Sequence, residues 1–248
     1  MTNSLEHVVG TLNDLAPLNL AAAWDNVGLL IQGRAFDSPV RTIFMCIDLT
    51  PTVAEELLAR QPELVIAYHP LIFGGLKRLV RREPKQAVIL RLIRDAISLY
   101  SPHTALDATR GGVCDWLLDQ LPPCSNRMPI TPAEGSAGEG MGRRADLIRP
   151  LLMNELSESL KQNLGLEMLQ AAVADRHQDE PIETVAVCPG AGGSLFDGAP
   201  PADLLVTGEM RHHDVLAHRE RGTSVLLTNH TNCERGFLSR YRQWIVKK

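Results

Sequence analysis

The stretch Leu64-Val-Ile-Ala-Tyr68-His69 is a short apolar run that ends in a histidine. Four consecutive aliphatic residues without polar alternation are typical of a strand that is covered on both faces, as in a parallel sheet. Two further runs have this form, Ile97-Ser-Leu-Tyr-Ser-Pro102-His103 and Val225-Leu-Leu-Thr-Asn229-His230. Because such runs alternate with longer helical segments, the sequence predicts an α/β protein with mixed, largely parallel sheets.

The rest of the chain continues this alternation. Residues 24–31 are expected to form a turn followed by a strand. Thr50 is a candidate N-cap for the helix predicted at residues 51–60. Helices are predicted at residues 5–15, 51–60, 84–94, 112–121, 154–164, 214–221 and from about 234. Strands are predicted at residues 42–47, 64–67, 97–100, 184–188, 203–206 and 224–227.

Residues 122–144 differ in composition from the segments on either side. They are rich in Pro, Gly and Ser and include Pro132-Ala-Glu-Gly-Ser-Ala-Gly-Glu-Gly140, a composition typical of a linker. We therefore expect two α/β units. The first would comprise residues 1–125 together with about 222–248, and the second would comprise residues 126–221.

The overall composition is that of a globular protein with an aliphatic core. Of the 248 residues, 44% are hydrophobic and 22% are charged, whereas only 4% are aromatic. The net charge of −4 argues against a broad surface for nucleic acids or anionic membranes. The short basic stretch Lys77–Arg82 could contact an anionic ligand, but a solvated loop or helix face is the favoured interpretation.

The cysteines and the first residues of the chain bear on its compartment. Five scattered cysteines without a CxxC pair favour free thiols in a reducing environment over a disulfide framework or a zinc ribbon. The first residues contain no secretory signal pattern, and no segment approaches the roughly 20 apolar residues of a membrane span. We therefore expect a soluble, cytoplasmic protein.

Three histidines, His69, His103 and His230, stand at the carboxyl ends of predicted strands. This edge of an open α/β sheet is where ligands bind. Asp107 and Glu234 follow two of these histidines at i+4, which places each pair on one face if the segment turns helical. Imidazole and carboxylate groups suit first-row metals, and carboxylates can bridge two ions. The set predicts a site for a pair of metal ions, although any one of these histidines alone is more simply a capping or packed residue.

A second polar cluster, Thr207-Gly-Glu209-Met-Arg-His212-His213-Asp214, also follows a predicted strand. Gly208 permits a tight turn there. Glu209, His212 and His213 are candidates for proton transfer or for supporting a metal ligand. The alternative is a helix N-terminus decorated with polar residues.

Four other features receive simpler interpretations. Asp25 and Asp48 lie near strand ends and are expected to be turn or capping residues. The Gly-rich segment Cys188-Pro-Gly-Ala-Gly-Gly-Ser194 lacks the Lys-Ser/Thr of a phosphate-binding loop and is expected to form a tight structural turn. Cys233 could be a soft metal ligand, but a buried free thiol is favoured.

Several of these segments, taken in order, resemble a known family. They are Trp24-Asp-Asn-Val-Gly-Leu29, Tyr68-His-Pro-Leu-Ile-Phe73, Ser101-Pro-His-Thr-Ala-Leu-Asp107, Gly140-Met-Gly-Arg143, Thr207-Gly-Glu-Met-Arg-His-His213 and His230-Thr-Asn-Cys-Glu-Arg-Gly236. Together they resemble the dinuclear metal centre hexameric proteins, also called GTP cyclohydrolase I type 2 homologues or the Nif-three-like family. The Tyr-His-Pro version resembles the eukaryotic-type branch, and the resemblance runs almost end to end.

The resemblance implies two α/β units with a metal-binding cleft between them and a homohexameric ring. It implies two divalent metal ions (Fe, Zn, Mn or Co) on the ligand set His69, His103, Asp107, His230 and Glu234. Many bacterial members carry two adjacent histidines where this chain has Tyr68-His69, so Tyr68 would be a weak ligand or water would take that position.

Two functions remain open at this point. One is a metal-dependent hydrolase, similar to GTP cyclohydrolase, that acts on a small nucleotide-like substrate through metal-activated water. The other is a non-catalytic protein that binds or delivers metal, or that acts as a regulatory interaction partner. No direct nucleic-acid or membrane partner is expected.

Overall fold

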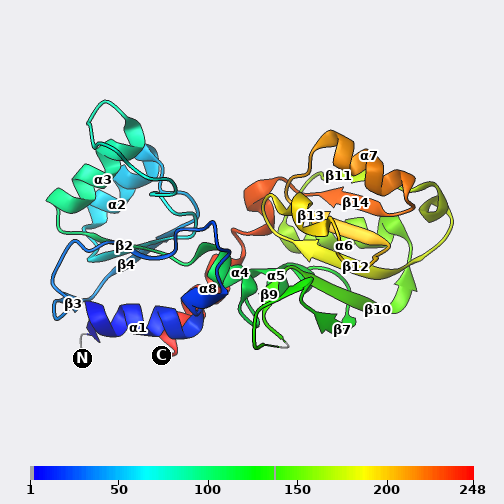
Figure 1. Cartoon of the computed structure of the whole chain (residues 1–248), viewed down its shortest axis with the longest axis horizontal. Coiled ribbons are helices and arrows are strands. Elements are labelled where there is room, and N and C mark those ends of the chain that lie inside the picture. Colours follow the sequence, from blue (N-terminus) through cyan, green and yellow to red (C-terminus); the bar gives the residue numbers. More distant parts are fainter. Residues whose placement is uncertain (1–2, 137) are drawn as a thin grey trace. The chain divides into compact units, whose positions relative to one another are not determined.

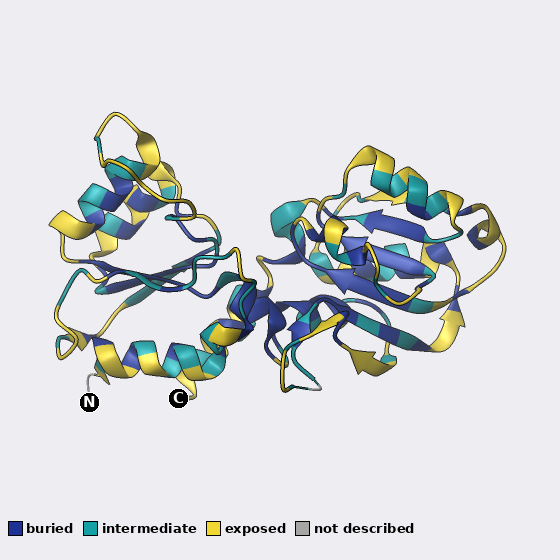
Figure 2. Cartoon of the chain, in the orientation of Figure 1, coloured by how far each residue is buried: buried dark blue, intermediate teal, exposed yellow. Residues whose placement is uncertain are grey.

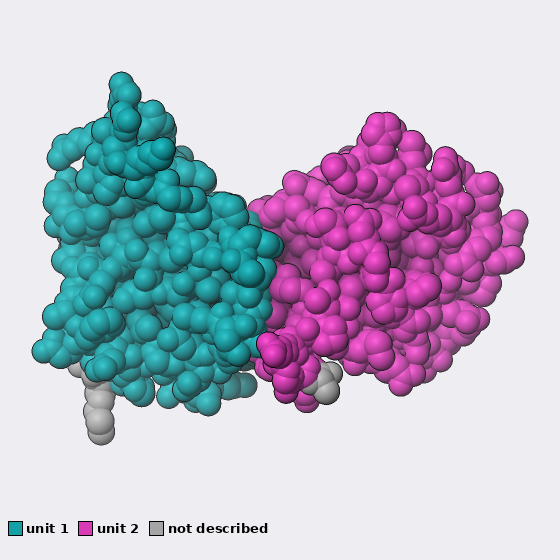
Figure 3. Space-filling view, in the orientation of Figure 1, with its two compact units in different colours: residues 1–106, 238–248 teal, residues 107–237 magenta. Residues whose placement is uncertain are grey.

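The computed structural model describes residues 3–136 and 138–248. The chain divides into two compact units (Figure 3). Unit 1 comprises Met1–Leu106 and Leu238–Lys248, and unit 2 comprises Asp107–Phe237. Each unit has its own mixed sheet and its own hydrophobic core, so the chain has the α/β fold class that the sequence predicts.

The sheet of unit 1 has four strands, in the order β2 (Gly28–Ile31), β6 (Ser98–Ser101), β5 (Leu64–Ala67) and β4 (Ile43–Cys46). β4, β5 and β6 are parallel, whereas β2 pairs with β6 in the antiparallel direction. β5 is buried at every position, as its unbroken aliphatic run predicts. Helices α2 (Pro51–Arg60) and α3 (Pro84–Arg94) cover one face of this sheet, and α1 (Leu5–Leu15) covers the other (Figure 1).

Helix α2 shows how local sequence sets these elements. The Thr50 side chain accepts a hydrogen bond from the backbone N–H of Val53 at 3.3 Å and so caps the first turn, as predicted. Gln61 ends the helix in the left-handed conformation, with a φ of 46°. Between these ends, Ala54 and Leu57 are fully buried against the sheet, which fixes the helix on its face.

The sheet of unit 2 has six strands, in the order β11 (Gln170–Ala172), β14 (Ser224–Leu227), β13 (Leu204–Thr207), β12 (Ile182–Cys188), β10 (Arg143–Leu151) and β7 (Cys124–Met128). The three central strands, β12, β13 and β14, are parallel. The outer strands pair in the antiparallel direction. The parallel core that the sequence predicts is therefore extended on both sides by antiparallel strands.

The central strands of unit 2 are buried on both faces. Successive residues point to opposite sides, so Val187 packs with helices α5 (Val113–Leu118) and α6 (Met153–Leu164), whereas Ala186 packs with Phe196. Helix α7 (His212–Glu220) lies on the same side as Phe196 and contributes the partly buried Val215. Figure 2 shows the strands of both units mainly buried and the exposed residues on outer helix faces and loops.

The prediction of a linker at residues 122–144 is wrong. This region contains β7, the short strands β8 (Thr131–Pro132) and β9 (Gly140–Met141), and the start of β10. β8 and β9 form an antiparallel hairpin, and β7 pairs with β10 inside the large sheet. The Pro and Gly residues stand in or beside the turns between these strands, so the composition reflects closely spaced turns rather than an unstructured connection.

The sequence-based division of the chain also differs from the observed units. Residues 107–125 and 222–237 were expected in the first unit, but they lie in unit 2. The reason is strand pairing and helix packing: β14 pairs with β13 and β11, and α5 packs against β12 and β10. Only Leu238–Lys248, most of the terminal helix α8 (Phe237–Val246), returns to unit 1.

The predicted helices and strands otherwise lie within a few residues of the observed ones. The remaining elements are β1 (Asn3–Ser4), β3 (Pro39–Val40), α4 (His103–Ala108) and the short 3-10 helices η1 (Leu18–Leu20), η2 (Asp175–Gln178), η3 (Gly192–Phe196) and η4 (His230–Cys233). In the described part of the chain, none of the helices combines the length and the apolar character needed to cross a bilayer.

Candidate metal centre

His69 stands two residues beyond β5, and a neighbouring strand supplies its partner. Cys46 of β4 pairs with Ala67 of β5 in a parallel register. Asp48 and His69 each stand two residues beyond this pair, so they lie beside each other. Nδ1 of His69 lies 2.9 Å from Oδ1 of Asp48. Because a carboxylate accepts a hydrogen bond, this contact favours the tautomer with the proton on Nδ1 and leaves Nε2 as the metal-binding nitrogen.

His103 has the same arrangement with a different carboxylate. Its Nδ1 lies 2.8 Å from Oδ1 of Asp25, whose side chain is fully buried. Asp25 also accepts hydrogen bonds from the backbone N–H and the hydroxyl of Thr104. Burial works to raise the pKa of Asp25, but the hydrogen bonds from His103 and Thr104 and the charge of His103 outweigh it and lower that pKa. Asp25 is therefore an ionised partner that orients the His103 ring.

The two imidazoles of unit 1 are neighbours. Their ring centroids lie 5.3 Å apart at an interplanar angle of 76°. The buried Tyr68 ring packs against both of them, 4.9 Å from His69 and 5.6 Å from His103. His103 takes a positive φ of 30°, which is uncommon for a residue with a side chain and is frequent at functional sites. Unit 1 thus brings together two of the predicted ligands and the tyrosine beside them.

Asp107 lies on α4, one helical turn after His103, as the i, i+4 spacing predicts. It is only 6% exposed. The pKa of Cys188, at the end of β12, is raised by a hydrogen bond with Cys114, by burial and by the charges of Asp107 and Cys233. The predicted ligand therefore belongs to the interior of unit 2.

Arg143 anchors the segment that follows Asp107. Arg143 is 1% exposed, and its guanidinium forms a fork with the Asp115 carboxylate at 2.9 and 3.0 Å. The same group donates to the carbonyl oxygens of Ala108 and Thr109, immediately after Asp107, and to two carbonyls of its own turn. These bonds satisfy the buried charge and fix the C-terminal end of α4.

His230 and Glu234 are the candidate ligand pair of unit 2. Nε2 of His230 lies 3.5 Å from Oε1 of Glu234, which is 3% exposed. The segment that connects them is the 3-10 helix η4, which is wound more tightly than the predicted α-helical turn. The two side chains nevertheless lie close together, as the i, i+4 spacing predicts. Asn229, just before η4, takes a φ of 67°, the second positive φ beside a predicted ligand.

Glu209 stands on the other side of the His230 ring. Its Oε2 lies 3.2 Å from Nδ1 of His230, the same nitrogen that Asp48 and Asp25 contact in the other two histidines. Glu209 is held by a hydrogen bond from its backbone N–H to the carbonyl oxygen of Gly190. All three candidate histidine ligands therefore have a carboxylate at Nδ1.

Gly190 makes this arrangement possible, and the sequence analysis missed its connection with the site. Its φ is +62°, and an added Cβ would lie 2.6 Å from Oε1 of Glu234 and 3.1 Å from Nε2 of His230. An added Cβ at Gly208 would lie 2.6 Å from the carbonyl oxygen of Gly190. The segment bends at residues 189–191 and continues as the 3-10 helix η3, and Gly190 packs directly against the candidate ligands. The sequence feature that could have indicated this connection is the position of Gly190 directly after β12, because β12 is parallel to β13 and β14 and their carboxyl ends lie at the same edge of the sheet.

Cys233 forms hydrogen bonds with Gly190 and His230. Its sulfur accepts a hydrogen bond from the backbone N–H of Gly190 at 3.2 Å and donates to the carbonyl oxygen of His230 at 3.0 Å. Burial raises the pKa of this thiol to about 12, and the nearby Glu234 carboxylate adds to the shift. These contacts agree with the interpretation of Cys233 as a buried free thiol.

His212 and His213 lie apart from these contacts. Both are exposed on the first turn of α7, and their rings pack against each other with centroids 5.4 Å apart. Among residues 3–136 and 138–248, no hydrogen bond, ion pair or ring contact connects either of them with a candidate ligand. Glu209 is the member of this predicted cluster that contacts the site.

The sequence analysis expected Asp25 and Asp48 to be turn or capping residues, and it did not predict that each contacts a candidate histidine ligand. Asp25 does accept bonds from the backbone N–H groups of Asn26 and Thr104, so the capping role is present. Besides this capping role, Asp25 contacts His103, and Asp48 contacts His69. Separations of 78 and 21 residues gave no local sequence pattern from which to predict these pairs.

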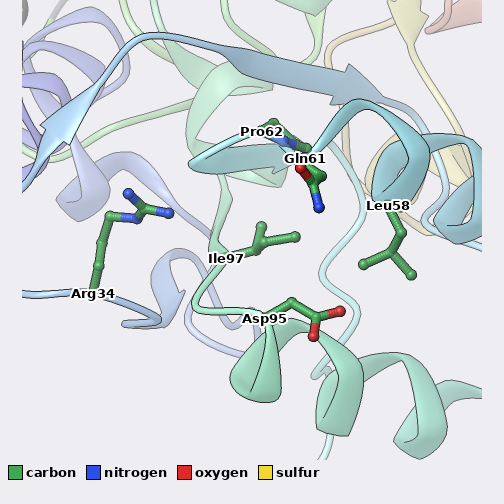
Figure 4. Close-up of a pocket in the computed structure, with 6 residues that line it drawn as sticks. All are labelled: Arg34, Leu58, Gln61, Pro62, Asp95 and Ile97. Carbon is green, nitrogen blue, oxygen red and sulfur yellow. The ribbon is translucent and has the colours of Figure 1, made fainter.

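A separate cavity in unit 1 contains none of these side chains. It has a volume of about 290 Å³ and is lined by Arg34, Leu58, Gln61, Pro62, Asp95 and Ile97 (Figure 4). Pro62 and Ile97 precede β5 and β6, so the cavity lies at the amino ends of the parallel strands. His69 and His103 follow the carboxyl ends of the same strands, which makes the two locations distinct.

The donor set fits a divalent metal. His69, His230 and Glu234 are a group of side chains that could hold a metal ion. Imidazole nitrogen and carboxylate oxygen suit iron, zinc, manganese and cobalt alike. A carboxylate at the second ring nitrogen is the usual support of a histidine that binds metal.

Comparison with known proteins agrees with the resemblance seen in the sequence. The chain is 39% identical over 244 residues to NIF3-like protein 1 of Drosophila melanogaster, which covers 98% of this chain and 82% of that protein. It is 35% identical over 251 residues to NGG1-interacting factor 3 of Saccharomyces cerevisiae, covering 94% of this chain and 87% of that protein.

Solved structures share the fold. The structure of reduced HcgD from Methanocaldococcus jannaschii superposes with a TM-score of 0.85 at 20% identity, covering 100% of this chain and 95% of that chain. At this identity the likeness concerns the fold alone. The model of the Duf34/NIF3 family (NGG1p interacting factor 3) matches residues 3–248. The chain therefore belongs to the Duf34/NIF3 family, as its motifs predict.

Proposed function

We propose that this protein binds two divalent metal ions through His69, His103, Asp107, His230 and Glu234, and that it is a metal-dependent hydrolase of a small, nucleotide-like substrate. One observation carries the proposal. Nδ1 of each of the three histidines is within 3.2 Å of a carboxylate, from Asp48, Asp25 and Glu209 respectively. Three independent pairs of this kind are not needed for packing, but they are the arrangement that orients imidazoles toward metal.

The chemistry follows from the donor set. When bound, a divalent metal lowers the pKa of a coordinated water far enough to supply hydroxide at neutral pH. Asp48, Asp25 and Glu209 would keep the three Nε2 atoms deprotonated and aimed. We assign Glu209 chiefly to positioning His230, and we propose His212 and His213 for proton transfer because they follow Glu209 by three and four residues.

Substitution of the two acidic ligands tests the assignment. Asp107→Ala and Glu234→Ala are expected to lower the metal content of the purified protein, because each removes a carboxylate from the site. Glu167→Ala is the matched control, because Glu167 is an exposed carboxylate of the same unit. Metal content is measured by elemental analysis. Equal content in all three variants would refute the ligand assignment.

Turnover separates catalysis from metal binding alone. We expect the metal-loaded protein to hydrolyse a member of a panel that contains GTP and simple phosphoesters, and Glu209→Gln to slow that reaction. If no compound is consumed and Glu209→Gln changes nothing measurable, the hydrolase part of the proposal fails, whereas the metal site stands on the elemental analysis.

A second candidate function is a regulatory interaction without catalysis. The observation that favours it is the name of the yeast relative, NGG1-interacting factor 3, which is 35% identical to this chain. We also propose a homohexamer, on the resemblance of the motifs. Light scattering of the purified protein would give a mass near six chains of 27.3 kDa each, and a monomer mass would refute the ring.

A further inference from the structure

Residues 70–94 of unit 1 concentrate positive charge. They contain seven of the 25 Lys and Arg residues of the chain and a single acidic residue, Glu83, in a protein whose net charge is −4. Apolar side chains are interleaved with these charges, among them Leu76 and Leu79. The proposed metal site uses none of residues 70–94, because His69 precedes them, so the segment has no part in the proposed function.

A groove of about 570 Å³ runs between β2, this segment and α3. β2 contributes Leu30 and Ile31 to its walls, the segment contributes Leu76 and Leu79, and α3 contributes Ile93. Leu76, Leu79 and Ile93 are 44%, 40% and 50% exposed. Large aliphatic side chains gathered around one hollow are uncommon on a monomeric surface and mark an interaction site.

Helix α3 is more apolar than its place on the sheet requires. Val88, Ile89 and Leu92 are buried and hold the helix on the sheet. Ile93 is only half buried, and half of its surface faces solvent. The groove therefore has an aliphatic wall that the fold itself does not use.

Basic side chains stand at the edge of the groove. Lys77 and Arg78 are part of its lining, and Arg81 and Arg82 follow them. Within residues 3–136 and 138–248, none of these four forms an ion pair. Four uncompensated cations beside an apolar hollow are complementary to a ligand that carries acidic and apolar groups together.

A second, smaller hollow is lined by other residues of the same segment, three of them arginines. It has a volume of about 150 Å³ and is lined in part by Arg81, Arg91 and Arg94. Arg91 forms an ion pair with Glu55, and Arg94 forms one with Asp95. Carboxylates of the chain itself thus occupy two of the three guanidinium groups, and the third, Arg81, remains for a carboxylate of a partner.

We propose that this groove, bounded by β2, residues 72–79 and α3, binds an acidic amphipathic segment of another protein. Aliphatic side chains of the partner fill the hollow, and its carboxylates pair with Lys77, Arg78 and Arg81. The lining contains no aromatic residue on which a nucleic-acid base would stack. The proposal is independent of the metal centre.

Binding of designed peptides tests the proposal on the full chain. The probe is a fluorescent peptide of Leu and Glu with Leu at every third or fourth position, and the comparison peptides replace Leu by Ser or Glu by Lys. We expect only the Leu/Glu peptide to bind in fluorescence anisotropy. Its affinity should fall at least about tenfold between about 0.05 M and about 0.5 M salt, because screening weakens the charge pairs.

Variants locate the binding site. The double variants Leu76→Ser with Leu79→Ser, and Lys77→Glu with Arg78→Glu, are each expected to weaken binding at least about tenfold. The control is Arg242→Glu with Lys247→Glu, which makes the same change of charge at exposed positions of unit 1. Circular dichroism melting confirms that each variant is folded, and metal content should equal that of the parent.

Four outcomes would overturn the proposal. Equal binding of the Ser- or Lys-substituted peptides would show that recognition is nonspecific, and unchanged affinity in both groove variants would place the peptide elsewhere. Tighter binding of anionic vesicles or of a single-stranded oligonucleotide would assign the surface to another class of ligand. A lower mass of the groove variants in light scattering would show that a second copy of this chain covers the groove.

Discussion

At the scale of single residues, the candidate centre depends on carboxylates that bind no metal in our proposal. Asp48 contacts His69, and Asp25 contacts His103, through Nδ1 in both cases. The sequence indicated the histidines because each follows an apolar run that is recognisable locally. It could not indicate these carboxylates, because the contacts depend on which strands and turns become neighbours in the fold.

Replacement of Asp48 tests this supporting role. Asp48→Asn is expected to weaken metal binding about 10–100-fold, because the amide no longer holds the His69 tautomer and ring orientation. Cobalt titration followed by absorption would measure the affinity. Asp37→Asn is the matched control, because Asp37 is an exposed carboxylate of the same unit. If Asp48→Asn binds cobalt as tightly as the control, His69 does not depend on Asp48.

Gly190 provides a second test at this scale. Gly190→Ala is expected to lower metal content, because the new Cβ would come within 2.6 Å of Oε1 of Glu234. Gly165→Ala controls for the strain of a positive φ, since Gly165 has a φ of +67° and open space where the Cβ would be. Elemental analysis compares the two. The same metal content in both variants would show that the turn does not restrict the Glu234 side chain.

At the scale of elements, the sequence predicted most helices and strands because their apolar periods are strong. It failed at residues 122–144, where composition was mistaken for a linker. The strands there are short, irregular or at the sheet edge, and β7 is mostly exposed, so no apolar period marks them. β10 reads Arg143-Arg-Ala-Asp-Leu147, and a buried arginine at its first position hides the alternation.

That arginine joins α4, α5 and β10, so its removal should be costly. Arg143→Met is expected to lower the free energy of unfolding by about 3–5 kcal/mol, because Asp115 is left as an uncompensated, largely buried charge. Arg149→Met is the control, since Arg149 forms an exposed ion pair with Glu155 and should contribute less than about 1 kcal/mol. Urea unfolding measures both. Similar losses in the two variants would contradict the anchoring role.

Asp203 directly precedes β13, and its carboxylate accepts hydrogen bonds from Thr184 of β12. Its ionisation should make the free energy of unfolding depend on pH. Burial works to raise the pKa of Asp203, but hydrogen bonds from Thr184, Arg176 and the backbone of Glu183 outweigh it and lower that pKa. A carboxyl with a lower pKa in the folded state stabilises the protein above its unfolded pKa, about 3.9 for Asp. This stabilisation is lost as the pH falls through the folded pKa.

The stability difference between the parent and Asp203→Asn should therefore be full at pH 7 and should shrink as the pH falls below about 4. Urea midpoints at a series of pH values measure it. Asp179→Asn, at an exposed position of the same unit, serves as the control. A difference that stays constant down to the lowest pH would show that ionisation of Asp203 is not the stabilising factor.

At the scale of the whole molecule, the predicted ligands span residues 69–234 and belong to both units. The sequence brought them into one hypothesis through a single rule, that ligands gather at the carboxyl ends of parallel strands. That rule applied to each unit, because β5 and β6 in one and β13 and β14 in the other are parallel. Domain limits could not be predicted in the same way, because β14 pairs within unit 2 whereas the following helix α8 returns to unit 1.

The most direct test of the proposed centre is the number of metal ions per chain. The parent protein would be purified without chelator, supplied with iron, manganese, zinc or cobalt, desalted and measured by elemental analysis. We predict about two ions per chain in the parent and a clear loss in both His69→Ala and Glu234→Ala. A parent protein that retains no metal under any of these conditions would contradict the account.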